Sequence, residues 1–202
     1  QLTETEFSII ARTMVESFDQ VSLWRHNFQP GDEVVALIGH EGGLPLPAST
    51  IDSSADKVHA VAGKTAFDLQ NLNLPLDSQT ILLFYAGNLT ESRTLFDEAP
   101  LNTDDRPFIE YMAPRSFRGR GGEGSPWFVG EPLVSLIANV QTLCPPARDP
   151  LLVKRTKSNQ RLPIAGTAFH RARLAEVNGD LVGMRQSWEK FVREWTNADA
   201  LE

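Results

Sequence analysis

Residues 3–18 read TETEFSIIARTMVESF and residues 33–39 read EVVALIG, and these two stretches decide the fold class. In the first stretch, Thr3 followed by Glu6 forms a capping box, in which each side chain satisfies a free backbone N–H at a helix start. The apolar residues that follow recur on one helical face: Phe7, Ile10, Met14, Val15 and Phe18. This periodicity predicts an amphipathic helix over residues 4–18.

The helix is followed by two segments with the character of β-strands. Residues 21–28 predict one strand, and Pro30-Gly31-Asp32 predicts a turn after it. Residues 33–39 form a continuous apolar run with β-branched residues, which is typical of a strand covered on both faces. A helix, a strand, a turn and a second strand in this order predict the end of an α/β sheet, with the last strand antiparallel to its neighbours.

The middle of the chain alternates between helical and irregular patterns. A second amphipathic helix is expected to about residue 72, and a short helix is expected to end at Gly87 in a left-handed conformation. Residues 100–115 read as a polar turn followed by a short extended piece. Glycine-rich residues 116–131 predict a linker rather than a phosphate loop, because the Gly-Lys-Ser/Thr ending is missing.

After this linker, the sequence predicts a helical tail over residues 132–202. Pro132 suits a helix start, where its missing N–H costs nothing. Two further helices are expected at about 163–177 and 180–196, separated by Asn178-Gly179. The expected organisation is therefore an α/β unit over residues 1–115, a linker, and a mainly α-helical tail.

Composition excludes some classes of function. The 202 residues carry a net charge of -7 with a pI of about 5.1, which argues against nucleic-acid binding and is compatible with a cationic partner.

The cysteine and histidine content argues against metal binding. The single cysteine, Cys144, allows no intrachain disulfide and no thiolate metal cluster, and it is expected to be a core residue. The histidines show no metal-ligand spacing. The sequence contains no run of about 18 apolar residues and no visible signal peptide.

Two segments resemble spermidine synthases, especially the large, often membrane-fused bacterial type. The first is Leu2–His40, with FSIIART at 7–13, VSLW at 21–24 and VALIG at 35–39. It is similar to the closing helix and last two strands of their Rossmann-like, methyltransferase-type domain. The second is NTDDRPFIEY at 102–111, which resembles a motif near the end of the same proteins. The resemblance covers roughly the first 115 residues and identifies a C-terminal part of such a protein.

The resemblance implies transfer of an aminopropyl group from decarboxylated S-adenosylmethionine to putrescine. In the family, an aspartate takes the proton from the attacking amine, and the co-substrate lies at a glycine-rich βα turn with its ribose on an acidic residue. None of these motifs occurs here, and they are expected before Gln1. The chain is therefore expected to hold no catalytic and no cofactor-binding residue, and to depend on a missing N-terminal half. The implied location is cytoplasmic, with membrane association through that upstream region.

Three acidic residues are candidates for binding a polyamine. Asp104 and Asp105 form a carboxylate pair that suits an ammonium group, and Glu110 follows in the expected extended piece. The structural alternative is that Asp104 or Asp105 caps a turn before Pro107, while Arg106 pairs with a neighbouring acid. The sequence leaves both interpretations open.

The tail supports a second hypothesis of a different class. Gly179-Asp180 lies between two expected helices, with small and aromatic residues around it, and resembles one tetratricopeptide repeat. Arg171 and Met184 depart from that pattern, and a single repeat cannot form a solenoid. The alternative to an enzyme fragment is thus a non-catalytic module whose helical tail binds a protein partner. In either case, the hairpin is expected to be held by Trp188, Phe191 and Trp195 packed on a stripe of alanines, with Trp188 largely buried.

Overall fold

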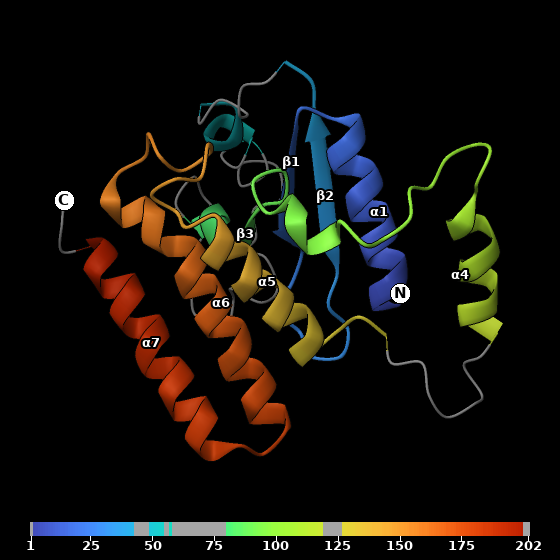
Figure 1. The fold of residues 1–202 in the computed structure, drawn as a ribbon. Coiled ribbons are helices and arrows are strands. Elements are labelled where there is room, and N and C mark those ends of the chain that lie inside the picture. Colours follow the sequence, from blue (N-terminus) through green and yellow to red (C-terminus); the bar gives the residue numbers. More distant parts are fainter. Residues whose placement is uncertain (1, 43–48, 55–56, 58–79, 119–126, 200–202) are drawn as a thin grey trace.

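The computed structural model describes residues 2–42, 49–54, 57, 80–118 and 127–199. Its elements form a mixed α/β architecture in which a small sheet lies between the first helix and the helices of the tail (Figure 1). Residues 49–54 are helical. The helix expected up to residue 72 and most of the glycine-rich linker lie outside the described residues.

The first helix, α1, spans Glu4–Ser17 and confirms the prediction from the capping box. The Thr3 hydroxyl accepts a hydrogen bond from the Glu6 N–H, and Glu6 Oε2 accepts one from the Thr3 N–H at 2.7 Å. The backbone N–H groups of Thr3 and Glu6, which have no partner within the helix, are thereby hydrogen-bonded. The apolar face of α1 is buried through Phe7, Ile9 and Ala11.

The sheet contains β1 (Gln20–Arg25), β2 (Val35–His40) and β3 (Tyr85–Asn88), in the order β2-β1-β3. Both pairings are antiparallel, with Leu23 opposite Leu37 on one side and Gly87 on the other. The expected helix followed by two neighbouring antiparallel strands is confirmed. The described residues show a three-stranded antiparallel sheet and no Rossmann-like sheet.

β2 is not covered on both faces, although its continuous apolar run had predicted this, because Ala36 and Ile38 are exposed. It is an edge strand, and within the described part of the chain no strand pairs with its outer side. Val34 beside it and Ile38 within it are 48% and 39% exposed. Within the described residues, the apolar run therefore belongs to a strand with one exposed face, which the hydrophobicity of the run alone did not reveal.

The prediction of a short helix that ends at Gly87 is also wrong. A 3-10 turn, η1, covers only Thr80–Leu83, and the chain then enters β3. Gly87 lies inside this strand with φ of 142°, and a Cβ there would come within 2.5 Å of Val140 on the neighbouring helix. Close approach of that helix, rather than helix capping, explains this glycine.

The expected extended piece after residue 107 is helical. A 3-10 turn, η2, spans Arg93–Phe96, and α4 spans Phe108–Arg118 with Pro114 inside it. Glu110 therefore lies in the first turn of a helix. Pro107 precedes the helix, where its ring does not disturb the hydrogen-bond ladder.

The tail is helical, as expected. It comprises α5 (Glu131–Leu143), α6 (Lys157–Val177) and α7 (Leu181–Asp199), and α6 and α7 form an antiparallel hairpin (Figure 1). α6 begins six residues before the predicted start, because Thr156 caps it by accepting from the Asn159 N–H at 3.2 Å. Gly179 in the turn has φ of 70°, a left-handed conformation that suits glycine.

Two clusters of buried side chains connect the tail to the sheet. One joins α1, β1 and α5 through residues such as Phe7, Leu23 and Ile137. The other joins η1, β3 and α6 around Phe28, whose ring centroid lies 5.0 Å from those of Phe84 and Phe169. The tail is thus packed directly on the sheet.

The hairpin is packed as expected, with large aromatic residues of α7 against small residues of α6, but with one difference. Ala165, Ala168 and Ala172 on α6 are buried, and Phe191 on α7 is 6% exposed. Trp188 is only partly buried, although its ring lies 5.5 Å from that of Phe169. Phe191, not Trp188, is thus the more deeply buried anchor of α7.

Replacing Trp188 with alanine is therefore expected to lower the free energy of unfolding by about 2 kcal/mol. This is below the 3–5 kcal/mol typical of a fully buried aromatic, because part of the indole already contacts water. Urea unfolding followed by circular dichroism measures the change. Exposed Leu181→Ala is the matched control, and an unchanged midpoint for the Trp188 variant would show that the indole does not hold the hairpin.

Candidate functional site

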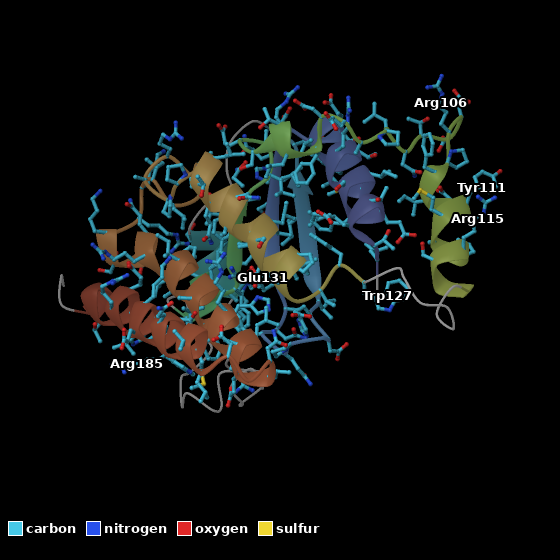
Figure 2. The ribbon with its side chains drawn as sticks, turned by 60° about the horizontal axis from the view of Figure 1, so that its bottom comes forward. Arg106, Tyr111, Arg115, Trp127, Glu131 and Arg185 are labelled. Carbon is cyan, nitrogen blue, oxygen red and sulfur yellow. The ribbon has the colours of Figure 1, made fainter. Side chains whose placement is uncertain are left out.

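The acidic motif forms a tight turn on the surface. Thr103 and Arg106 exchange two backbone hydrogen bonds, at 2.9 and 3.2 Å, and enclose Asp104 and Asp105 between them. Both aspartates are exposed, and neither carboxylate forms a hydrogen bond within the described residues. Arg106 also forms no ion pair there and extends into solvent (Figure 2). Within the described residues, the structural alternative of an aspartate cap with a paired Arg106 is not seen.

This turn is fastened to α1 by side chains of the helix. The Thr13 hydroxyl accepts from the Asn102 N–H at 2.9 Å, and Arg12 Nη1 donates to the Ala99 carbonyl at 2.7 Å. The Asn102 side chain in turn accepts from the Ile109 N–H at 2.9 Å and so caps the start of α4. One asparagine thus fixes both the turn and the following helix.

A surface cleft of about 510 Å³ lies beside the turn. Its charged lining consists of Asp105 together with the guanidinium groups of Arg12 and Arg106. Asp104 and Glu110 do not line it, and Glu110 is exposed on α4. The structure therefore does not gather the three predicted acidic residues in one pocket, and polyamine binding by them stays a prediction.

A buried carboxylate that sequence analysis did not single out joins three elements. Glu33 Oε1 accepts from the Gly130 N–H at 2.9 Å and lies 3.3 Å from His170 Nε2, while Oε2 accepts from the Gly31 N–H at 2.9 Å. The Glu33 and His170 side chains are each 1% exposed. Burial alone raises the pKa of Glu33, but the hydrogen bonds from His170 and the backbone outweigh it, so the pKa is lowered.

Arg25 is a second buried charge, at the end of β1. Its guanidinium donates to the Leu83 carbonyl at 2.9 Å and to the Thr167 hydroxyl, and it lies over the Phe28 ring. Burial lowers the pKa of Arg25 to about 9, so the group stays protonated at neutral pH. No carboxylate in the described chain pairs with it. The only sign of these buried contacts in the sequence was that a charged residue, Arg25, lies within an apolar predicted strand.

A third buried group involves Tyr85 and Asp149. The Tyr85 hydroxyl donates to Asp149 Oδ2 at 2.8 Å, and burial raises the pKa of Asp149 to about 6. Burial also raises the pKa of the Cys144 thiol to about 12, so Cys144 is a core residue, as expected, and not a thiolate nucleophile. The cavity beside Tyr85 measures about 10 Å³ and admits at most one water. The buried contacts of Glu33, of Arg25 and of the Tyr85–Asp149 pair therefore hold elements of the fold together.

Comparison with protein-family models, curated proteins and solved structures found no match. Within the described ranges, no three His, Cys, Asp or Glu side chains lie close enough together to hold a metal ion. None of the helices described there has both the length and the apolar character needed to cross a bilayer.

Proposed function

We propose that this chain is the C-terminal part of a spermidine synthase-like aminopropyltransferase. In this role the chain supplies the end of the catalytic sheet and supports it. The aminopropyl transfer from decarboxylated S-adenosylmethionine to a polyamine takes place on residues of a preceding segment. The Rossmann-like character of the sheet belongs to this proposal.

One observation carries it: the two segments that resemble the family lie in contact. Thr13 belongs to the first segment and Asn102 to the second, and their hydrogen bond joins regions far apart in the chain. Arg12 reinforces this contact through the Ala99 carbonyl. A chance likeness in two separate stretches would not require them to be neighbours in space.

The outer edge of β2, which has no partner strand among the described residues, supports the same proposal. Its outer edge offers backbone N–H and C=O groups, and Ile38 is 39% exposed beside them. Exposed, apolar edge strands are usually covered in native proteins, because they otherwise pair with other chains. A sheet that continues beyond β2 in a preceding segment would cover this edge.

The proposal predicts that the isolated chain neither binds decarboxylated S-adenosylmethionine nor transfers an aminopropyl group. We expect no saturable heat in a calorimetric titration, and no spermidine when putrescine is supplied as acceptor. The positive control is the longer gene product that includes the sequence upstream of Gln1, in which both binding and transfer are expected.

Two outcomes would contradict the proposal. Micromolar binding of the co-substrate to this chain alone would show that the nucleotide site is not upstream. Loss of transfer even in the longer product would remove the enzymatic assignment.

Within that longer product, Asp105→Asn tests whether the acidic turn takes part in binding the acceptor. A raised KM for putrescine would assign Asp105 to the acceptor site.

A second candidate function is a non-catalytic interaction module. The observation that favours it is an exposed apolar set on the hairpin, in which Val177, Leu181 and Val182 are each at least 66% exposed. Leu181→Ser with Val182→Ser would abolish partner capture under this hypothesis, but would leave aminopropyl transfer by the longer product unchanged under the first.

A further inference from the structure

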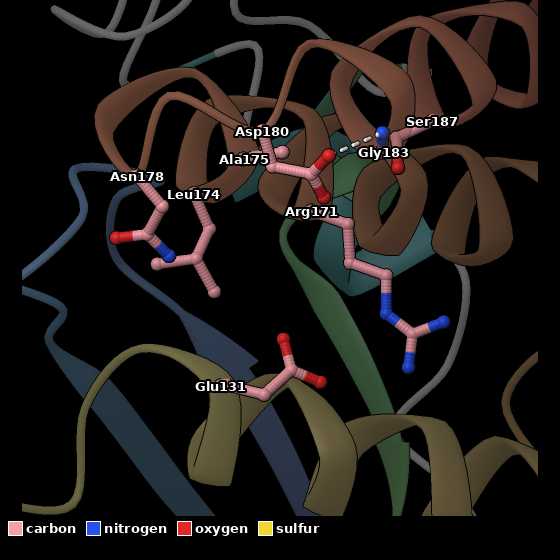
Figure 3. A pocket seen from close by; sticks show the side chains of 8 residues that line it. All are labelled: Glu131, Arg171, Leu174, Ala175, Asn178, Asp180, Gly183 and Ser187. Atoms are coloured by element: carbon pink, nitrogen blue, oxygen red, sulfur yellow. Dashed lines mark hydrogen bonds between the residues drawn. The ribbon is translucent and has the colours of Figure 1, made fainter.

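A cleft of about 380 Å³ lies between the first turn of α5 and the α6–α7 hairpin. Leu174 and Ala175 of α6 form its apolar wall, and Asn178 and Ser187 add neutral polar groups. Its volume falls at the small end of the range of ligand pockets. Figure 3 shows Glu131 projecting from α5 toward the hairpin and the Arg171 guanidinium projecting from α6 toward α5.

Arg171 differs from the other arginines of the hairpin. It is half-buried, yet it forms no hydrogen bond or ion pair with any described residue. The remaining arginines of α6 and α7 each lie within ion-pair distance of a glutamate, in the pairs Arg161–Glu194, Arg173–Glu176, Arg185–Glu189 and Arg193–Glu194. The cleft thus contains a half-buried cation that has no anionic partner among the described residues.

Two carboxylates line the same cleft, and each is positioned by one hydrogen bond. Asp180 Oδ1 accepts from the Gly183 N–H at 2.9 Å and caps α7, as Figure 3 shows. Glu131 Oε1 accepts from the Ser135 hydroxyl at 2.9 Å. Within the described chain, the second oxygen of each carboxylate has no hydrogen-bond partner. Each carboxylate therefore retains a free acceptor for an ammonium group.

We propose that this cleft binds a small zwitterion of the α-amino-acid class, with its carboxylate on Arg171 and its ammonium group on Glu131 and Asp180. A simple anion would meet two carboxylates, and a simple cation would meet the Arg171 guanidinium. A zwitterion satisfies both signs of charge, and a short aliphatic side chain fits the wall formed by Leu174 and Ala175.

Nuclear magnetic resonance titration of the chain with three related probes tests this proposal. The probes are L-leucine, 4-methylpentanoate, which lacks the amine, and 3-methylbutylamine, which lacks the carboxylate. We expect saturable shifts of the Arg171 side-chain and Gly183 backbone signals with L-leucine. Each single-charge probe is expected to bind about tenfold or more weakly, because it loses one charge-assisted hydrogen-bond set.

Matched variants locate the site. Arg171→Gln is expected to weaken L-leucine binding about tenfold or more, while Arg173→Gln, two residues away on the same helix, leaves it unchanged. Glu131→Gln is expected to reduce the preference for L-leucine over 4-methylpentanoate, because only Asp180 then remains to accept from the ammonium group. Unchanged backbone spectra in the absence of ligand show that the variants remain folded.

Three results would overturn the proposal. The first is the lack of any saturable shift with L-leucine. The second is equal affinity for L-leucine and 4-methylpentanoate, which would make the cleft a simple anion site. The third is L-leucine binding that survives Arg171→Gln, which would place the ligand elsewhere.

Discussion

Replacing Gly166 with alanine is expected to lower the free energy of unfolding by about 3 kcal/mol, at the upper end of the usual cost of overpacking. Gly166 lies where α6 crosses η1, and a Cβ there would stand 2.0 Å from the Leu83 carbonyl oxygen and 3.1 Å from Arg25 Nη1. A backbone carbonyl cannot rotate away as a side chain can. α6 must therefore shift, which also disturbs the hydrogen bond from Arg25 to Leu83. Urea unfolding followed by far-ultraviolet circular dichroism measures the loss.

Gly183→Ala is the matched control on the neighbouring helix. Its Cβ would come within 2.1 Å of Asp180 Oδ2, the end of an exposed side chain that can turn aside. Alanine also gains up to about 1 kcal/mol over glycine in helix propensity, which offsets a weakened cap. We expect a change within about 1 kcal/mol. Equal midpoints for the two variants would show that α6 does not lie against η1.

Asp149→Asn is expected to raise the free energy of unfolding at about pH 8 by about 3 kcal/mol. The pKa of Asp149 rises on folding from 3.8 to about 6, because burial disfavours its charge. The neutral Asp149 carboxyl therefore contributes its stability fully below pH 3.8, and this contribution is lost as pH rises through 6 and the buried group ionises. A shift of about two pH units corresponds to about 3 kcal/mol. Asparagine mimics the neutral acid, because the Tyr85 hydroxyl can rotate to accept from its amide.

The pH dependence separates this effect from simple repacking. The variant and the parent protein are expected to be equally stable near pH 3.5, and their difference should grow between about pH 4 and pH 6. Glu33→Gln is the contrasting control. The lowered pKa of Glu33 means that its ionised form contributes stability above pH 4.5 and loses it as pH falls further. This variant should therefore destabilise the protein at neutral pH. A stability difference for Asp149→Asn that does not vary with pH would contradict the assigned pKa.

Local sequence was sufficient for the elements whose stability depends on neighbours along the chain. The Thr3–Glu6 capping box and the apolar periodicity after it predicted α1, and the β-branched run predicted β2. The helical hairpin followed from periodicity interrupted at Asn178-Gly179. In each case, the hydrogen bonds and the face to be buried involve residues within a few positions, so the pattern contains the information.

Only the tertiary structure decided how these elements meet. Residues 85–88 became a strand because β1 offered an unpaired edge, although their sequence had favoured a helix end. Glu33 is stabilised in the core by Gly130 and His170, partners that no local pattern connects to it. The Asn102 side chain starts α4 because Thr13 holds its backbone, which overrode the extended tendency of a proline-rich segment. Strand pairing and the satisfaction of buried polar groups depend on residues distant in the chain, so these features exist only once the chain has folded.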